Sequence, residues 1–148
     1  MCIRDSLDAF LDSLVLDYQD SGQQVLLETI TGAVIDTRPH ALRRVLVNLI
    51  DNALKFAGAA HLEVESGAGQ RTLIRVLDNG PGIPVDELEE VLKPFYRVEG
   101  SRNRTTGGTG LGLAIAHQLT QAIGGSLSLS NRDGGGLCAQ IELPARGV

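Results

Sequence analysis

The alternation of helix-like segments with pairs of strand-like segments constrains the fold of this chain more than any other feature. Apolar residues recur every three or four positions in three segments, which predicts helices over residues 6–18, 39–56 and 110–123. The stretches between them alternate or run apolar, as strands with one buried face do. Strands are expected at residues 23–30, 33–36, 60–65, 71–77, 126–130 and 137–143, and a short helix at 86–92.

This order predicts an α/β fold, a two-layer sandwich in which helices pack on one face of a mixed, mostly antiparallel sheet. Residues 67–70 and 131–134 have the glycine and polar composition of hairpin turns, which supports pairing of the strands on either side of them. Asp36 or Thr37 is expected to cap the second helix, with Pro39 tolerated in its first turn.

The composition limits the classes of function. The 148 residues are enough for one domain with its own core, and 43% hydrophobic and 21% charged residues are typical of a globular protein. A net charge of −5 and few aromatic residues argue against nucleic-acid binding, which needs a basic face or stacking platforms. Since no apolar run reaches the roughly 18 residues of a membrane span, we expect no membrane contact by this domain either.

The first six residues, Met-Cys-Ile-Arg-Asp-Ser, resemble the translation of a transposase adapter used in sequencing libraries. We therefore expect residues 1–6 to be a non-native leader, which fold reasoning should set aside, and residues 7–148 to form one domain of a longer parent protein. A short native N-terminus is the alternative.

Glycines gather just before the third expected helix, at Gly107, Gly108, Gly110 and Gly112. Without a Cβ they let the backbone approach a ligand closely, and the first turn of the helix offers unpaired N–H groups. This arrangement favours an anion site, for which phosphate is the usual ligand, but a flexible linker has the same composition.

The segment before these glycines is polar and basic. Residues 99–106, together with Arg97 and Arg102, suggest a lid that closes over phosphates, and a solvated surface loop is the alternative. Phe95 and Tyr96 are adjacent in a chain that has only three Phe, two Tyr and no Trp. Their clustering suggests an anchor for this loop, although an ordinary core contact fits equally well.

Three polar residues share one flank of the helix expected at 39–56. Asn48, Asn52 and Lys55 lie at positions i, i+4 and i+7, beside the apolar stripe. Two amides and an ammonium in line are suited to a metal ion and phosphates, whereas a solvated flank is the simpler interpretation. Asp51 falls opposite the apolar stripe and is expected to be exposed.

A carboxylate follows the strand expected at 71–77, in the run Asp78-Asn-Gly-Pro-Gly-Ile83. Asp78 is suited to accept a hydrogen bond from a ligand amine while Gly80 and Gly82 let the backbone turn beneath it. The same residue types are also favoured in an ordinary turn, so the run does not separate the two interpretations.

These signals occur together in one order. They are Asn48-Leu-Ile-Asp-Asn-Ala-Leu-Lys-Phe56, Asp78-Asn-Gly-Pro-Gly-Ile83, Pro94-Phe-Tyr-Arg97 and Gly108-Thr-Gly-Leu-Gly-Leu113. The series resembles the N, G1, F and G2 boxes of the catalytic, ATP-binding domain of sensor histidine kinases, within the GHKL superfamily and its Bergerat fold. The resemblance extends over nearly the whole chain from about Leu7, and it implies ATP and Mg²⁺ as ligands.

The resemblance also implies roles for single residues. Asn48 matches the asparagine that ligates Mg²⁺, and Asn52 matches one that contacts phosphate oxygens near it. Lys55 matches the phosphate-binding lysine, and Phe56 an aromatic residue that packs on adenine. Asp78 matches the carboxylate that accepts the adenine amino group.

Further matches concern the loops. Gly80 and Gly82 match glycines that pass close to the base, and Phe95 matches the anchor of the ATP lid. Arg97 and Arg102 are implied partners of the γ-phosphate and, with Asn48 and Lys55, form the implied catalytic set. The other implied nucleotide-binding residues, among them the glycines under the phosphates, are Ile83, Gly108, Thr109, Gly110, Leu111 and Gly112.

Asn48 also bears on the class of reaction. Gyrase-like and chaperone-like ATPases and anti-sigma serine kinases of the superfamily resemble one another in placing a Glu at this position, as a general base. An amide cannot accept that proton, whereas a neutral imidazole acceptor is already nucleophilic. The resemblance therefore implies a histidine autokinase, with an ATPase, a serine kinase or a non-catalytic nucleotide-binding module as alternatives.

The chain differs from a complete kinase in one respect. His40, His61 and His117 lie outside any His-Glu-x-x-x-Pro-like box and are expected to be structural or at the surface. The resemblance then implies that the phosphoacceptor histidine lies on a separate dimerisation domain of a homodimeric parent, which passes the phosphate to a response regulator. It also implies a cytoplasmic domain of a parent anchored in the bacterial inner membrane. The isolated chain is expected to bind Mg²⁺-ATP without phosphorylating itself.

Overall fold

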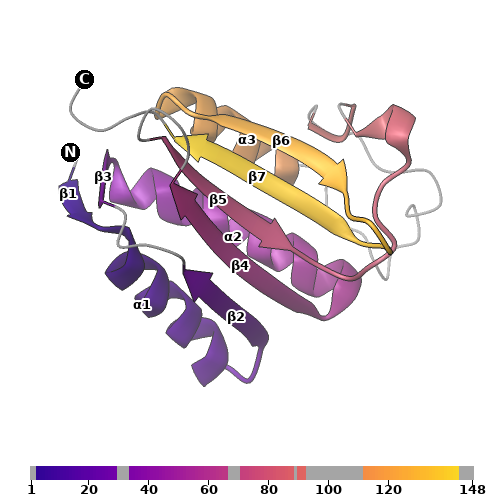
Figure 1. Ribbon diagram of the computed structural model, residues 1–148, viewed down its shortest axis with the longest axis horizontal. Helices are drawn as coiled ribbons and strands as arrows, with labels where there is room; N and C mark the ends of the chain where they lie inside the picture. Colours follow the sequence, from indigo (N-terminus) through magenta and orange to yellow (C-terminus); the bar gives the residue numbers. More distant parts are fainter. Residues whose placement is uncertain (1–2, 30–33, 67–70, 89, 93–111, 144–148) are drawn as a thin grey trace.

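The computed structural model describes residues 3–29, 34–66, 71–88, 90–92 and 112–143. Within them a five-stranded sheet has the strand order β2-β4-β5-β7-β6 (Figure 1). β2 runs parallel to β4, and the other neighbours are antiparallel, as predicted for a mixed, mostly antiparallel sheet. The strands are β2 (Gln24–Thr29), β4 (Ala59–Ser66), β5 (Thr72–Leu77), β6 (Ser126–Asn131) and β7 (Leu137–Leu143).

The α-helices of the described residues are α1 (Leu7–Asp20), α2 (Pro39–Ala57) and α3 (Gly112–Ala122). In Figure 1, α2 and α3 lie behind the sheet, and these two helices also pack against each other. The strands alternate accordingly, so that Leu62, Val64 and Ile141 are fully buried in one core with the helices. The predicted two-layer sandwich is confirmed in this arrangement.

α2 contributes the largest share of the helical core. Its amphipathic pattern places one apolar stripe against the sheet and leaves polar residues on the flanks. The helix ends at Gly58, whose left-handed φ of 77° lets its N–H bond the carbonyl of Leu54, and β4 begins at the next residue. The buried residues of the stripe are Leu42, Val45, Leu46, Leu49, Ile50 and Ala53.

The start of α2 differs from expectation. The N-cap is Arg38, with no side-chain capping bond, so the prediction of a cap at Asp36 or Thr37 was wrong, although Pro39 does stand in the first turn. The reason is that β3 (Val34–Thr37) holds both residues extended in an antiparallel ladder with β1 (Ile3–Ser6). The expected leader thus pairs with β3 through its residues 3–6, and its non-native origin stays a prediction.

The short helix expected at 86–92 was also wrong. Two 3₁₀ turns replace it, η2 (Val85–Glu87) and η3 (Glu90–Leu92). Seven residues are too few for an α-helix to persist on its own strength, since isolated helices need roughly 12–15. Packing decides instead, because Val91 is buried with Ile83 and Leu137 in a small second core.

A hydroxyl bond joins α1 to α2 at the surface. The Tyr18 hydroxyl donates to Oδ1 of Asp51 at 2.8 Å, and Asp51 is exposed as expected. Partial burial raises the pKa of Tyr18 well above its usual value, and the bond to the Asp51 carboxylate adds to the rise. None of the helices in the described part of the chain combines the length and the apolar character that a membrane span needs.

Two leucine substitutions test the position of the core. Leu46 is fully buried on α2, so Leu46→Ala should lower the free energy of unfolding by about 2–5 kcal/mol, as cavity-forming changes do. Leu16→Ala on α1 is the matched control because Leu16 is 54% exposed, and a change within about 0.5 kcal/mol is expected. Urea denaturation measures both, and equal losses would contradict this core.

Candidate functional site

Asp78 directly follows β5, the central strand of the sheet, and the loop that it begins meets the C-terminal end of α2. Its side chain is 93% buried, since only 7% of the residue surface is exposed. Its Oδ1 accepts hydrogen bonds from the N–H groups of Gly80 at 2.8 Å and Leu137 at 3.3 Å. Both donors bond the same oxygen, so among the described residues no donor is recorded on Oδ2. A buried carboxylate with an oxygen to spare is a strong hydrogen-bond acceptor for a ligand amine.

The loop after Asp78 passes very close to the end of α2. A Cβ added to Gly80 would lie 3.1 Å from Cβ of Ala57 and 3.2 Å from the carbonyl oxygen of Phe56. Gly82 has a φ of 74°, a backbone conformation in which a side chain would be strained. Gly80 therefore lets the loop touch the helix, and Gly82 lets it turn back so that Ile83 is buried at 8% exposure.

The polar flank of α2 leads toward this loop. Asn48 is half-buried, and its Nδ2 is a fully buried atom without a hydrogen-bond partner in the described part of the chain. Such an atom is costly to leave unpaired, so a hydrogen-bond acceptor beside this residue would stabilise it. Asn52 is half-buried one turn further on, and Lys55 and Phe56 are exposed at the end of the helix.

Of the remaining predicted site residues, the structure describes Gly112, and the others lie outside the described ranges. Gly112 is the first residue of α3 and is exposed, with open space where a Cβ would stand. The predicted end of α3 at Gly124 is confirmed, since this residue has a φ of 85° after the last helical turn. The residues that lie outside the described ranges are Phe95, Arg97, Arg102, Gly108, Thr109, Gly110 and Leu111.

The turn between β6 and β7 holds the Asp78 loop and was not foreseen as part of the site. Asn131 spans the backbone of Ile83, because its Oδ1 accepts the N–H at 2.9 Å and its Nδ2 donates to the carbonyl at 2.6 Å. Nη1 of Arg132 donates to the carbonyl of Asp78 at 3.0 Å and to Oδ1 of Asn79 at 2.9 Å. In sequence these residues carry only the signature of a turn.

Gly136 completes this contact. A Cβ on Gly136 would lie 2.0 Å from the carbonyl oxygen of Asp78, and the residue has a φ of 103°. Gly134 and Gly135 also have positive φ but open space around them. Three successive glycines exceed what a hairpin turn needs, and this excess was the available signal that a second segment approaches the turn.

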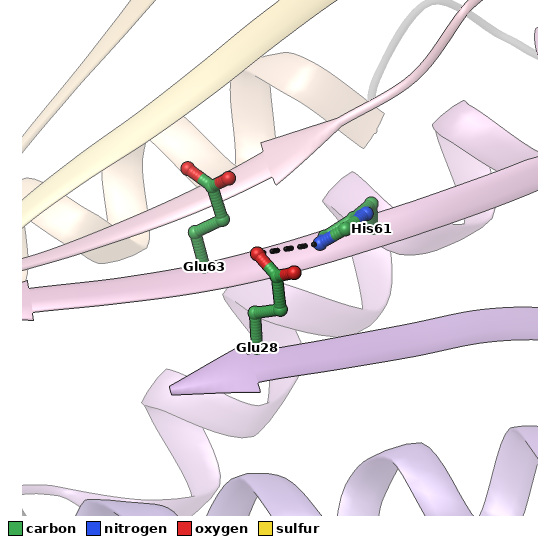
Figure 2. Close-up of side chains that lie close together, drawn as sticks. All are labelled: Glu28, His61 and Glu63. Atoms are coloured by element: carbon green, nitrogen blue, oxygen red, sulfur yellow. Dashed lines mark ion pairs between the residues drawn. The ribbon is translucent and has the colours of Figure 1, made fainter. Parts of the chain in front are cut away.

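A second cluster of ionisable side chains lies elsewhere on the sheet. Figure 2 shows Glu28 of β2 with His61 and Glu63 of β4, on the strand face opposite the helices. Nε2 of His61 lies 3.3 Å from a carboxylate oxygen of Glu28, an ion pair when the imidazole is protonated. His40 is exposed and His117 half-buried, so the three histidines occupy the surface or structural positions expected of them.

Comparison with known proteins places the chain in a family. Residues 37–147 match the family described as histidine kinase-, DNA gyrase B- and HSP90-like ATPases. The chain belongs to this family. The sensor protein KdpD of Mycobacterium tuberculosis is 44% identical over 105 residues, which are 70% of this chain and 12% of KdpD. The sensor histidine kinase GtrS of Pseudomonas aeruginosa is 40% identical over 111 residues, 75% of this chain and 22% of GtrS.

The chain therefore spans less than a quarter of the length of these two relatives. The ATP-binding domain of PrrB from Mycobacterium tuberculosis superimposes with a TM-score of 0.79 at 27% identity, over 99% of this chain and 98% of that domain. The catalytic domain of the histidine kinase ThkA gives a TM-score of 0.83 at 20% identity, over 100% and 99%. The resemblance to histidine-kinase catalytic domains and the Bergerat-type fold are thus confirmed.

Alanine at two of the turn glycines tests the contact with Asp78. Gly135→Ala should cost only the strain of a left-handed backbone, roughly 1–2 kcal/mol of unfolding free energy. Gly136→Ala should cost about 1–3 kcal/mol more, because the new methyl group must push the Asp78 carbonyl aside. Urea denaturation of both variants measures the difference, and equal losses would show that the loop does not press on Gly136.

Proposed function

We propose that this chain binds Mg²⁺-ATP and presents its γ-phosphate to a histidine on a separate dimerisation domain of a sensor histidine kinase. One observation carries the proposal. Asp78, a buried carboxylate with an oxygen to spare, lies beside the end of the same helix that bears the buried, unpartnered amide nitrogen of Asn48. Membership of the ATPase family supports ATP as the ligand.

The Asp78 loop is suited to adenine. The 6-amino group of adenine is a donor that a carboxylate oxygen can accept, whereas guanine offers a carbonyl oxygen there, which a carboxylate repels. Gly80 leaves the backbone bare next to Phe56, whose ring is exposed and can pack on a flat base. Ile83, buried with Val91 and Leu137, anchors the far end of this loop.

The flank of α2 is suited to the phosphates and to Mg²⁺. Mg²⁺ prefers oxygen ligands and keeps several waters, so a single amide oxygen from Asn48 would be enough protein ligation. The buried, unpartnered Nδ2 of the same amide would donate to a phosphate oxygen beside the metal ion. Bound Mg²⁺ would neutralise charge on the transferring phosphoryl group. Asn52 would donate to phosphate oxygens, and Lys55, exposed at the end of the helix, would offset their negative charge.

The residue at position 48 favours phosphoryl transfer to histidine over hydrolysis. Asn48 has no basic atom that could take a proton from water or from a hydroxyl group. A neutral imidazole needs no such base to attack phosphorus. The identity of the chain to sensor kinases supports the same reaction class over the ATPase and serine-kinase alternatives.

Further parts of this proposal concern residues and domains beyond the described structure. We infer that Phe95 anchors a lid, that Arg97 and Arg102 approach the γ-phosphate, and that the glycines of 108–112 line the triphosphate. Residues 7–148 would act within a dimeric, membrane-anchored parent that phosphorylates a response regulator. The names of the two relatives, a sensor protein and a sensor histidine kinase, support this assignment.

Nucleotide binding tests the base site. Asp78→Asn replaces an acceptor oxygen with a donor, so the Kd for ATP should rise at least about tenfold, because hydrogen bonds to charged groups contribute roughly 1.5–3 kcal/mol. Asp86→Asn, at an exposed carboxylate, is the matched control and should leave the Kd unchanged. Displacement of a fluorescent ATP analogue measures both Kd values. An unaltered Kd for ATP in Asp78→Asn would show that Asp78 does not bind the base.

The transfer step is tested with γ-labelled ATP. The isolated chain should remain unlabelled and release phosphate no faster than the buffer, because it offers no suitable acceptor and no base for water. Addition of the helical dimerisation domain of a related sensor kinase should yield acid-labile label on that domain. Acid-labile label on the isolated chain, or steady phosphate release, would contradict the proposed reaction.

A further inference from the structure

The C-terminal hairpin holds Asp78 at three different atoms. The backbone N–H of Asp78 donates to the carbonyl of Leu137 at 3.0 Å, and the Leu137 N–H returns a bond to the Asp78 side chain. The third contact is the bond from Arg132 to the carbonyl of Asp78. The position of the carboxylate therefore depends on residues that stand more than 50 positions later in the chain.

The contact from Arg132 differs from the two contacts with Leu137 because the hairpin makes it through a side chain and not through its backbone. The backbone of Arg132 is fixed by the turn itself, where its N–H bonds the carbonyl of Gly136 at 2.9 Å and its carbonyl accepts from the N–H of Gly135 at 3.1 Å. Nη1 carries two hydrogens, which suffice for the Asp78 carbonyl and for Asn79 Oδ1. A charged donor makes these bonds stronger than neutral ones.

The far end of the loop is held by the same turn. The Asn131 side chain hydrogen-bonds both the N–H and the carbonyl of Ile83, and Ile83 packs with Val91 and Leu137. The loop from Asp78 to Ile83 is thus fixed at both ends by adjacent residues of one turn. Because the Ile83 end keeps both of its bonds, removal of the Arg132 contact loosens only the end that bears the carboxylate, where the two bonds to Leu137 remain.

We propose that Arg132 is a positioning residue that fixes the Asp78 carboxylate for recognition of the adenine amino group, and so sets the preference for ATP over GTP. This inference rests on the proposed function, in which Asp78 is the adenine acceptor. In the described structure Arg132 bonds the Asp78 carbonyl and the Asn79 side chain rather than the Asp78 carboxylate. Its effect would therefore reach the nucleotide through the main chain of Asp78 and the side chain of Asn79.

The experiment compares ATP and GTP as competitors of a fluorescent ATP analogue on the full chain. Arg132→Ala should raise the Kd for ATP about tenfold, the effect of losing one charge-assisted bond. The Kd for GTP should not rise, because a well-placed carboxylate repels the guanine carbonyl rather than binding it, so the preference in affinity for ATP over GTP should fall at least about tenfold. Arg132→Lys keeps one charged donor and should restore part of this preference.

Two comparisons separate positioning from general stability. Arg71→Ala removes the same charge from an exposed ion pair with Glu142, at the far end of β5 and β7, and should leave both nucleotides unaffected. On an Asp78→Asn background, Arg132→Ala should have no further effect on the Kd for ATP, since the group it positions is gone.

The outcomes are distinct. Equal weakening of ATP and GTP binding by Arg132→Ala, or additive effects in the double variant, would make Arg132 a structural residue only. An unchanged Kd for ATP in Arg132→Ala, with the wild-type chain binding ATP, would overturn this proposal and leave the proposed function intact. A wild-type chain from which ATP displaces no analogue would instead overturn the proposed function.

Discussion

The apolar contact between α2 and the sheet sets the position of the site residues on α2 and of the helix end that the Asp78 loop meets. Burial of the stripe from Leu42 to Ala53 fixes the rotation of the helix, so the flank with Asn48 and Asn52 stands at the border of the core. The same contact brings the end of α2 against Gly80, at the point where β5 stops. Hydrophobic burial is non-directional, yet here it determines the direction in which polar groups face.

The charge of Asp78 is stabilised by backbone groups rather than by a cation on its carboxylate. The described donors to its Oδ1 are N–H groups of Gly80 and Leu137. A buried ion is costly unless it is hydrogen-bonded, and backbone donors satisfy one oxygen without occupying the other. The nearby cation, Arg132, bonds the main chain instead. A carboxylate held in this way keeps its acceptor strength for a ligand.

Much of this organisation could be predicted from the residues, and the failures have a common cause. Helical periodicity located α2, its stripe and the flank with Asn48, because these features depend on neighbours in sequence. The pairing of β3 with β1 and the bonds from Asn131 and Arg132 depend on segments far apart in the chain. A turn composition at 131–134 is the same whether or not another loop docks on it, so local patterns carry no trace of the contact beyond the surplus glycines.

The contact between Leu137 and Asp78 joins residues 59 positions apart, and this separation has a consequence for synthesis. Contacts of long sequence separation form late, since closing the intervening loop costs entropy before any bond compensates it. A growing chain that has not yet reached Leu137 can place α2 and β5 but lacks the Leu137 N–H that helps to fix the Asp78 carboxylate. Competence to bind a nucleotide should therefore arise only after β7 has left the ribosome, long after the helix that carries most of the binding residues.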